Sequence, residues 1–262
     1  ELKGSGTIDV APRFGPLLQS CGLVETVNAS TSVVYAPTST LSAIVGMAGR
    51  FPGARNVAQL WQNLLEARET ISHFRDDELE AAPEEDMAAR ASRAYVRARG
   101  ILDDVEMFDA NFFGINLKEA EVLDPQHRVF LETAWEALED AGYDPQRFAG
   151  PIGVFAGAGE NTYYLQNLLS RRDVTDIVGW FTMMTSKQND YLTTRVAYKL
   201  DLKGPALNIQ TACSTALVAV CSAVQSLLSY QCDMALAGGV SITLPQRRGY
   251  LWQEGMIISP DG

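Results

Sequence analysis

The chain has 262 residues, of which 47% are hydrophobic and 20% are charged. This is the balance of a globular protein with a sizeable core, and it excludes disorder over most of the length. No stretch approaches the roughly eighteen consecutive apolar residues of a transmembrane helix. The formal net charge of −11 repels phosphate backbones and anionic lipid surfaces, so we expect neither nucleic acid nor a membrane as a partner.

Residues 1–40 differ in composition from the rest of the chain. They are rich in Gly, Pro, Ser and Thr, which predicts a linker or loosely ordered N-terminal arm with one short helix near Leu17–Leu18. From residue 41 to residue 262, apolar runs of strand length alternate with helical patterns. This alternation predicts an α/β layered domain.

Most elements of this domain can be predicted from local signals. Asn56 is typical of a helix N-cap, and Asp124 followed by Pro125 opens the clearest helix, which ends at Gly142. Residues 68–106 are charged and irregular, which indicates a surface excursion with short helices. Further helices are predicted at Thr162–Leu169, at Lys187–Leu200 and from Cys213 to about Ser229. Strands are predicted at Ala43–Met47, Ile152–Ala156, Ala206–Gln210, Met234–Ala237 and Val240–Leu244.

The few cysteines and histidines indicate no metal site. They are Cys21, Cys213, Cys221, Cys232, His73 and His127, and the cysteines lack any C-x-x-C spacing. A disulfide framework is unusual in so long a chain with so few cysteines, and the first residues lack the features of a secretory signal. We therefore expect a cytoplasmic location, and the absence of an initiator Met predicts that the chain is part of a longer protein.

The sharpest local feature is the junction Gln210–Thr215, where a strand ends and a helix begins. Cys213 there lies at the positive end of the helix dipole, among N–H groups that lack intrahelical partners, and both effects favour the thiolate. The same N–H groups stabilise an oxyanion when a thiolate attacks a carbonyl. Position alone is equally compatible with a small buried residue, because free cysteines are commonly buried.

Several longer motifs occur in an order that a known family shares. They are Val45–Gly53, Leu123–Arg128, Gln210–Thr215, Ala237–Val240 and Gln253–Gly262. Together they resemble the β-ketoacyl synthase (ketosynthase) domain of modular type I polyketide synthases, and they cover residues 41–262 almost continuously. The stretch Asp190–Leu200 is most similar to ketosynthases of hybrid peptide–polyketide assembly lines.

The resemblance implies a thiolase-like fold, with residues 41–262 forming the N-terminal half of its duplicated βαβαβαββ architecture. It implies that Cys213 is the acyl-accepting nucleophile and that its backbone N–H helps to bind the oxyanion. The residues expected to support this site are Thr211, Ala212, Ser214, Gly238 and Gly239. The strand expected to pair across the two-fold axis of a homodimer consists of Ala206, Leu207, Asn208, Ile209 and Gln210.

The implied activity is that of a condensing enzyme, which extends an acyl chain on cysteine by decarboxylative Claisen condensation with a malonyl-type thioester. No bound cofactor is implied, because substrates arrive on the phosphopantetheine arms of acyl or peptidyl carrier domains. Further implied partners are a second copy of the chain and the other domains of a multienzyme. The family's catalytic histidines lie beyond Gly262, so His73 and His127 are expected to be structural.

Two alternatives stay open at this point. In the first, the chain is an assembly module or half-domain that is inactive without its C-terminal half. In the second, it is a Cys-dependent acyltransferase or hydrolase. The second alternative needs a base within reach of Cys213, and no good candidate is apparent near it in the sequence.

Overall fold

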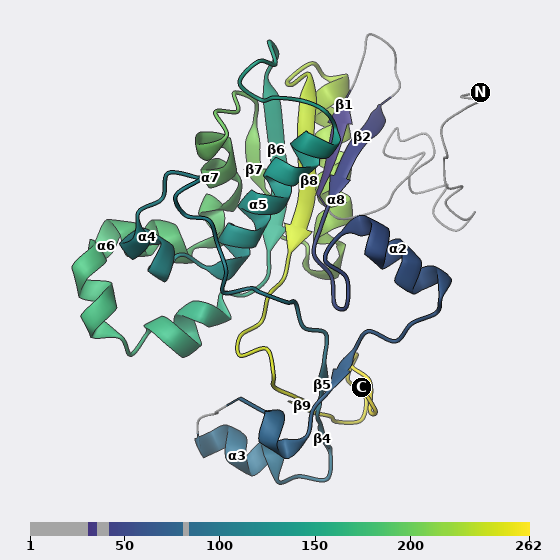
Figure 1. Ribbon diagram of the computed structural model, residues 1–262, viewed down its shortest axis with the longest axis vertical. Helices are drawn as coiled ribbons and strands as arrows, with labels where there is room; N and C mark the ends of the chain where they lie inside the picture. The colour runs from purple at the N-terminus through teal and green to yellow at the C-terminus, as the bar shows by residue number, and fades with distance from the viewer. Residues whose placement is uncertain (1–30, 36–41, 81–83) are drawn as a thin grey trace.

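The computed structural model describes residues 31–35, 42–80 and 84–262. At its centre is a five-stranded mixed sheet with the order β2-β1-β8-β6-β7 (Figure 1). Strands β6, β7 and β8 are parallel, whereas β1 runs antiparallel to both β2 and β8. The strands are β1 (Thr31–Tyr35), β2 (Ala43–Ala48), β6 (Ile152–Ala158), β7 (Ala206–Asn208) and β8 (Met234–Val240).

Helices cover both faces of this sheet, with α5 and α7 on one side and α8 on the other (Figure 1). The α/β class predicted from the sequence is therefore confirmed. The helices are α2 (Val57–Leu65), α3 (Glu84–Arg90), α4 (Leu117–Val122), α5 (Pro125–Asp140), α6 (Arg172–Lys187), α7 (Leu192–Lys199) and α8 (Thr215–Leu228). Short turns of other helix types span Asp76–Glu78, Tyr164–Leu168, Asn189–Tyr191 and Ala212–Ser214.

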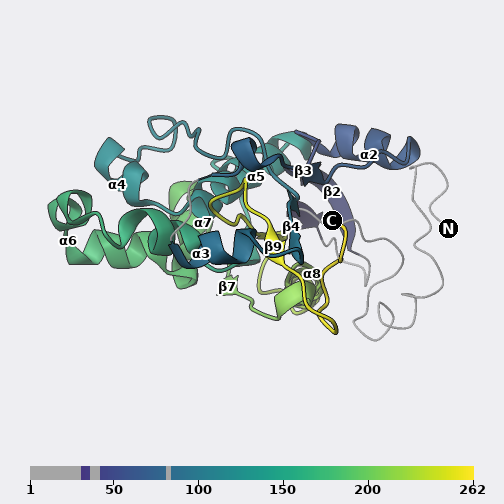
Figure 2. The ribbon, with the colours of Figure 1, turned by 90° about the horizontal axis from the view of Figure 1, so that it is seen from below.

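The predicted surface excursion contains α3 and also short strands that local patterns did not indicate. Two ladders form here, β3 (Ser72–His73) with β5 (Ala98–Arg99) and β4 (Tyr95–Val96) with β9 (Tyr250–Leu251). The ladders lie below the central sheet, and α3 lies beside them (Figures 1 and 2). Residues near the end of the chain thus pair with the excursion.

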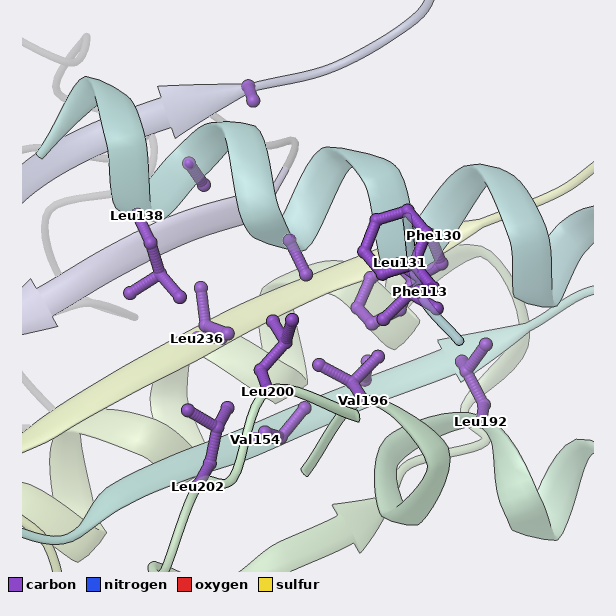
Figure 3. Close-up of a cluster of buried hydrophobic side chains, with 14 of the residues drawn as sticks. Phe113, Phe130, Leu131, Leu138, Val154, Leu192, Val196, Leu200, Leu202 and Leu236 are labelled. Atoms are coloured by element: carbon purple, nitrogen blue, oxygen red, sulfur yellow. The ribbon is translucent and has the colours of Figure 1, made fainter. Parts of the chain in front are cut away.

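The larger hydrophobic core lies between the sheet and helices α5 and α7. Phe130, Leu131 and Leu138 of α5 point toward Val154 and Leu236 of the sheet (Figure 3). Each of these side chains is almost fully buried, and burying a side chain of this size contributes roughly 1.5–3 kcal/mol. This packing fixes α5 against the strands that lead to the candidate site.

The starts of α5 and α2 agree with their predicted caps. The Asp124 carboxylate accepts a hydrogen bond from the Gln126 N–H at 2.9 Å, and Pro125 is the first residue of α5. The Asn56 side chain accepts one from the Gln59 N–H at 2.8 Å. In α2, however, the apolar residues Trp61, Leu64 and Leu65 are exposed rather than buried.

Three predictions about strands need correction. Thr31–Tyr35, within the segment predicted as a linker or arm, forms strand β1 between β2 and β8. Residues 1–30 and 36–41, with the helix predicted near Leu17–Leu18, lie outside the described residues. The two strands predicted at the end of the series are one strand, β8, because its glycines continue the parallel pairing with β6. Beyond Val240 the chain leaves the sheet, so Val240–Leu244 is not a strand.

The third correction concerns the predicted dimer strand, Ala206–Gln210. Strand β7 ends at Asn208, and Ile209 and Gln210 lead into the turn before α8. Within the described ranges, β7 pairs only with β6 and forms an open edge of the sheet. In the same ranges no helix has both the length and the apolar character that crossing a membrane requires.

Candidate functional site

The candidate site is the turn that connects β7 to α8. After Gln210 the chain forms a single 3₁₀ turn, Ala212–Ser214, and α8 begins at Thr215. Cys213 lies in the middle of this turn and is exposed. Ala212, directly before it, has a φ of 53°, a left-handed conformation that non-glycine residues rarely adopt. Such strain persists only where surrounding contacts enforce it, and it is often found at functional sites.

Contacts with the end of β6 hold this turn in place. The Ile209 N–H donates to the Ala156 carbonyl at 2.9 Å, and the Gln210 side-chain amide donates to the Ala158 carbonyl at 3.0 Å. The Ile209 carbonyl packs directly on Gly157, where a side chain would leave no room for it. The turn is therefore anchored to a fully buried strand rather than projecting as a free loop.

Two hydroxyl groups after the cysteine bond back to the residues before it. The Ser214 hydroxyl donates to the Thr211 carbonyl at 2.8 Å and lies 3.0 Å from the Thr211 hydroxyl. The Thr215 hydroxyl donates to the Ala212 carbonyl at 2.8 Å and accepts from the Thr211 N–H at 3.0 Å. These hydrogen bonds link Thr211, Ala212 and Ser214 in the turn around Cys213, and they add Thr215, which the sequence analysis did not single out.

The backbone N–H of Cys213 differs from those of the two residues that follow it. The N–H groups of Ser214 and Thr215 donate to the carbonyls of Thr211 and Ala212. In the part of the chain that the structure describes, neither the N–H nor the thiol of Cys213 makes a hydrogen bond. An unpaired N–H beside an exposed thiol is the arrangement that binds the oxyanion formed when the sulfur attacks a carbonyl.

Gly238 and Gly239 lie on β8 next to this turn. They pair with Ala156 and Gly157 of β6, and Gly239 faces the first turn of α8, where an added Cβ atom would lie 3.5 Å from the Cβ atom of Ala216. Gly238 is buried and Gly239 is exposed. The end of β8 therefore lies within ordinary van der Waals distance of the first turn of α8, which follows the turn that carries Cys213.

A cavity of about 790 Å³ lies beside the first turn of α8, with Ala216 and Gly239 in its wall. Its lining is mostly apolar and includes Phe51, Ile242 and Tyr250. Arg99 also lines it, and burial together with the nearby Arg248 lowers the pKa of the Arg99 guanidinium. Cys213 is not part of this wall.

The two histidines do not form a catalytic pair. His127 in α5 is 1% exposed, and both its ring nitrogens lack a hydrogen-bond partner. Burial, with a smaller effect of the nearby positive charge of Arg195, lowers the pKa of His127 to about 3, so the ring is neutral at pH 7. His73 lies in the exposed strand β3 of a two-stranded ladder.

The other cysteines occupy different surroundings from Cys213. Cys232 is buried, its thiol lies 3.4 Å from the Ser226 hydroxyl, and burial raises its pKa. Cys221 is half-buried on α8, and Cys21 lies outside the described residues. Among the described residues, no group of three or more His, Cys, Asp or Glu side chains is arranged to hold a metal ion.

Comparisons with known proteins agree on one family. The family model "Beta-ketoacyl synthase, N-terminal domain" matches residues 43–262. One component of the phenolphthiocerol/phthiocerol polyketide synthase of Mycobacterium tuberculosis is 47% identical over 84% of this chain and 15% of that protein. Polyketide synthase PksL of Bacillus subtilis is 39% identical over 84% of this chain and 5% of that protein.

Solved structures agree with this family. Ketosynthase twelve from the bacillaene polyketide synthase of Bacillus amyloliquefaciens has a TM-score of 0.71 and 33% identity, covering 88% of this chain and 38% of that chain. The fold is therefore thiolase-like, as the sequence predicted. The chain spans well under half the length of each of these three proteins.

Proposed function

The chain belongs to the β-ketoacyl synthase family, and we propose that it carries the nucleophile of a polyketide-type condensing enzyme. The observation that carries this proposal is the exposed Cys213 in a left-handed turn, with an unpaired N–H beside its thiol. The family model covers the N-terminal domain. The proposal therefore assigns acyl transfer to this part of the enzyme and decarboxylation to residues outside it.

Acyl transfer begins with attack of the Cys213 thiolate on the carbonyl of an incoming acyl thioester. The C–S bond to cysteine forms as the carbonyl becomes a tetrahedral oxyanion, to which the Cys213 N–H donates. Collapse of the oxyanion breaks the bond to the carrier sulfur, which leaves as a thiolate and takes up a proton. The product is an acyl group held on Cys213.

Condensation then uses a second, malonyl-type thioester. Loss of CO₂ leaves an enolate, whose α-carbon attacks the acyl-Cys213 carbonyl, and the cysteine thiolate is the leaving group. The product is a β-ketoacyl thioester two carbons longer than the original acyl chain. We propose that both substrates arrive on phosphopantetheine arms of acyl or peptidyl carrier domains, since the relatives are named as polyketide synthases.

We further propose that the chain acts as a homodimer within a multienzyme. Strand β7 is an edge of the sheet in the described part of the chain, and Leu207 on it is 51% exposed. Open strand edges present unpaired N–H and C=O groups, which a second copy running antiparallel satisfies. This pairing would extend the sheet across the two-fold axis.

A Cys-dependent hydrolase is less well supported. Such an enzyme needs a base that hydrogen-bonds to the nucleophile, and the Cys213 thiol has no such partner among the described residues. The His127 ring is buried and neutral, in α5 on the opposite side of the sheet from α8.

Selective labelling tests the proposed nucleophile. The chain is treated with a limiting amount of iodoacetamide and then digested, and the rate of modification of each cysteine is measured by mass spectrometry. We expect Cys213 to react first and Cys232, which is buried with a raised pKa, to react last. An acyl N-acetylcysteamine thioester should acylate the wild-type chain and Cys232→Ala but not Cys213→Ala. Faster modification of Cys21 or Cys221, or acylation of Cys213→Ala, would overturn the proposal.

A further inference from the structure

The side chain of Thr215 makes hydrogen bonds on both sides of Ala212, the strained residue before the nucleophile. Its hydroxyl accepts from the Thr211 N–H at 3.0 Å and donates to the Ala212 carbonyl at 2.8 Å. The two hydrogen bonds attach to the backbone on either side of the N–Cα bond of Ala212, about which φ is 53°. They therefore oppose relaxation of this residue to an ordinary right-handed or extended conformation.

The two hydroxyls of the turn do not make equivalent contributions. The Thr211 carbonyl, which the Ser214 hydroxyl reaches, also accepts from the Ser214 N–H at 3.3 Å. The Thr211 N–H, in contrast, has the Thr215 hydroxyl as its partner, and no second acceptor for it is present among the described residues. Removing the Thr215 hydroxyl therefore leaves a donor unpaired, whereas removing the Ser214 hydroxyl leaves its acceptor occupied.

Thr215 also contacts the strand beneath the turn. Its methyl group, with the Ile209 carbonyl, fills the space beside Gly157 in which a side chain would otherwise lie. The hydroxyl thus binds the turn, and the methyl packs on the end of β6. Because these two groups lie on one side chain, valine and serine substitutions separate their contributions.

We propose that Thr215 is a positioning residue, whose hydroxyl holds residues 211–213 in the left-handed turn and so orients the Cys213 thiol and N–H toward the thioester. This proposal rests on the proposed function of Cys213. Thr215 itself does not touch the substrate; it acts through the conformation of Ala212.

The test compares Thr215→Val, which keeps the shape and the methyl contact, with Thr215→Ser, which keeps the hydroxyl. The control is Thr185→Val, since the Thr185 hydroxyl also bonds to backbone carbonyls of its own helix, α6. In the full chain, the rate of iodoacetamide modification of Cys213 is measured from about pH 6 to 9. Thermal melts by circular dichroism are recorded in parallel.

We expect Thr215→Val to lower the rate across this pH range about threefold to tenfold, the effect of losing one hydrogen-bonding group. Thr215→Ser should keep the rate within about twofold of wild type, and Thr185→Val should leave it unchanged. If Thr215→Val melts below the assay temperature, Thr215→Ala takes its place, because alanine also lacks the hydroxyl and favours helix.

If Cys213 still reacts first in the wild type, two results would overturn the role of Thr215 and leave the proposed function of Cys213 intact. One is an unchanged rate in Thr215→Val, and the other is an equal loss of rate in Thr215→Ser, which would assign the effect to packing. A wild-type chain in which Cys213 is not the first cysteine to react overturns the proposed function, and with it the role of Thr215.

Discussion

The carbonyl oxygen of Ile209 occupies the space that a side chain at Gly157 would need. Gly157 lies in the fully buried strand β6, and Ile209 is the first residue after β7. The two strands are parallel neighbours, so this contact sets how closely the turn before α8 approaches the sheet. The position of Cys213 therefore depends on the absence of a side chain in a different strand.

We predict that Gly157→Ala displaces the turn. The added methyl group meets backbone atoms, which cannot move aside as the end of a flexible side chain can, and overpacking of this kind costs about 1–3 kcal/mol. We expect a lower melting temperature and slower iodoacetamide modification of Cys213. Gly142→Ala is the control, because an added Cβ atom there meets no neighbouring atom, although the positive φ of Gly142 makes that substitution strained as well. Equal modification rates in Gly157→Ala and wild type would contradict the prediction.

Stability should fall as the solution becomes acidic, because of His127. Its folded-state pKa is about 3 and its ordinary value is 6.5, so between these pH values the unfolded chain binds a proton that the folded chain does not. The free energy of unfolding therefore decreases as the pH falls below 6.5, by up to about 1.4 kcal/mol per pH unit.

Urea denaturation between about pH 5 and 6.5 measures this dependence. Below that range the raised pKa of Asp124, caused by its burial, acts in the opposite direction. His127→Gln should remove most of the slope, whereas the control His73→Gln, at an exposed strand, should keep it. A wild-type slope retained in His127→Gln would assign the acid sensitivity to other groups.

The proposed dimer should depend on the outward-facing backbone of β7. The Ile209 N–H points to β6, and N–H groups alternate in direction along a strand, so those of Ala206 and Asn208 point to the open edge. Ala206→Pro removes one of these donors without removing a bond to β6.

Sedimentation velocity at micromolar concentration provides the measurement. We expect a dimer for the wild-type chain and for the control Ala206→Ser, which keeps the N–H, and a monomer for Ala206→Pro. A strictly monomeric wild type, or an Ala206→Pro variant that dimerises as well as wild type, would argue against pairing through β7.

The chain by itself should acylate Cys213 slowly and should not release CO₂ from a malonyl thioester. Decarboxylation needs donors aimed at the developing enolate, and His127 is buried and neutral while His73 lies in a peripheral ladder. Mass spectrometry detects the acyl adduct, and radiolabelled malonyl thioester detects CO₂. When joined to the family's following half, the protein should do both, and Cys213→Ala should abolish acylation and condensation. Formation of a β-ketoacyl product by the chain alone would show that this division is wrong and would direct attention first to His127.

Local signals in the sequence determined the elements whose ends are set by neighbouring residues. The Asp124–Pro125 start of α5 and the buried run of β6 need only a capping carboxylate, a fixed proline φ and apolar residues of strand length. The connection between a strand and a helix around Cys213 was also predictable, although the strand ends at Asn208 rather than Gln210 and the α-helix begins at Thr215 rather than Cys213. The order of the motifs in the sequence indicated the family.

Only the tertiary structure decided features that depend on residues distant in sequence. Strand β1 lies in a segment whose composition is that of a linker, and it becomes a strand because β2 and β8 offer hydrogen bonds on both sides. Gly238 and Gly239 continue β8 instead of ending it because β6 pairs with them. The left-handed conformation of Ala212 has no signature in the sequence, because alanine rarely adopts it. The packing of the Ile209 carbonyl and the Thr215 methyl group on Gly157 of β6 is also hidden from the sequence, because composition and periodicity carry no information about such a contact.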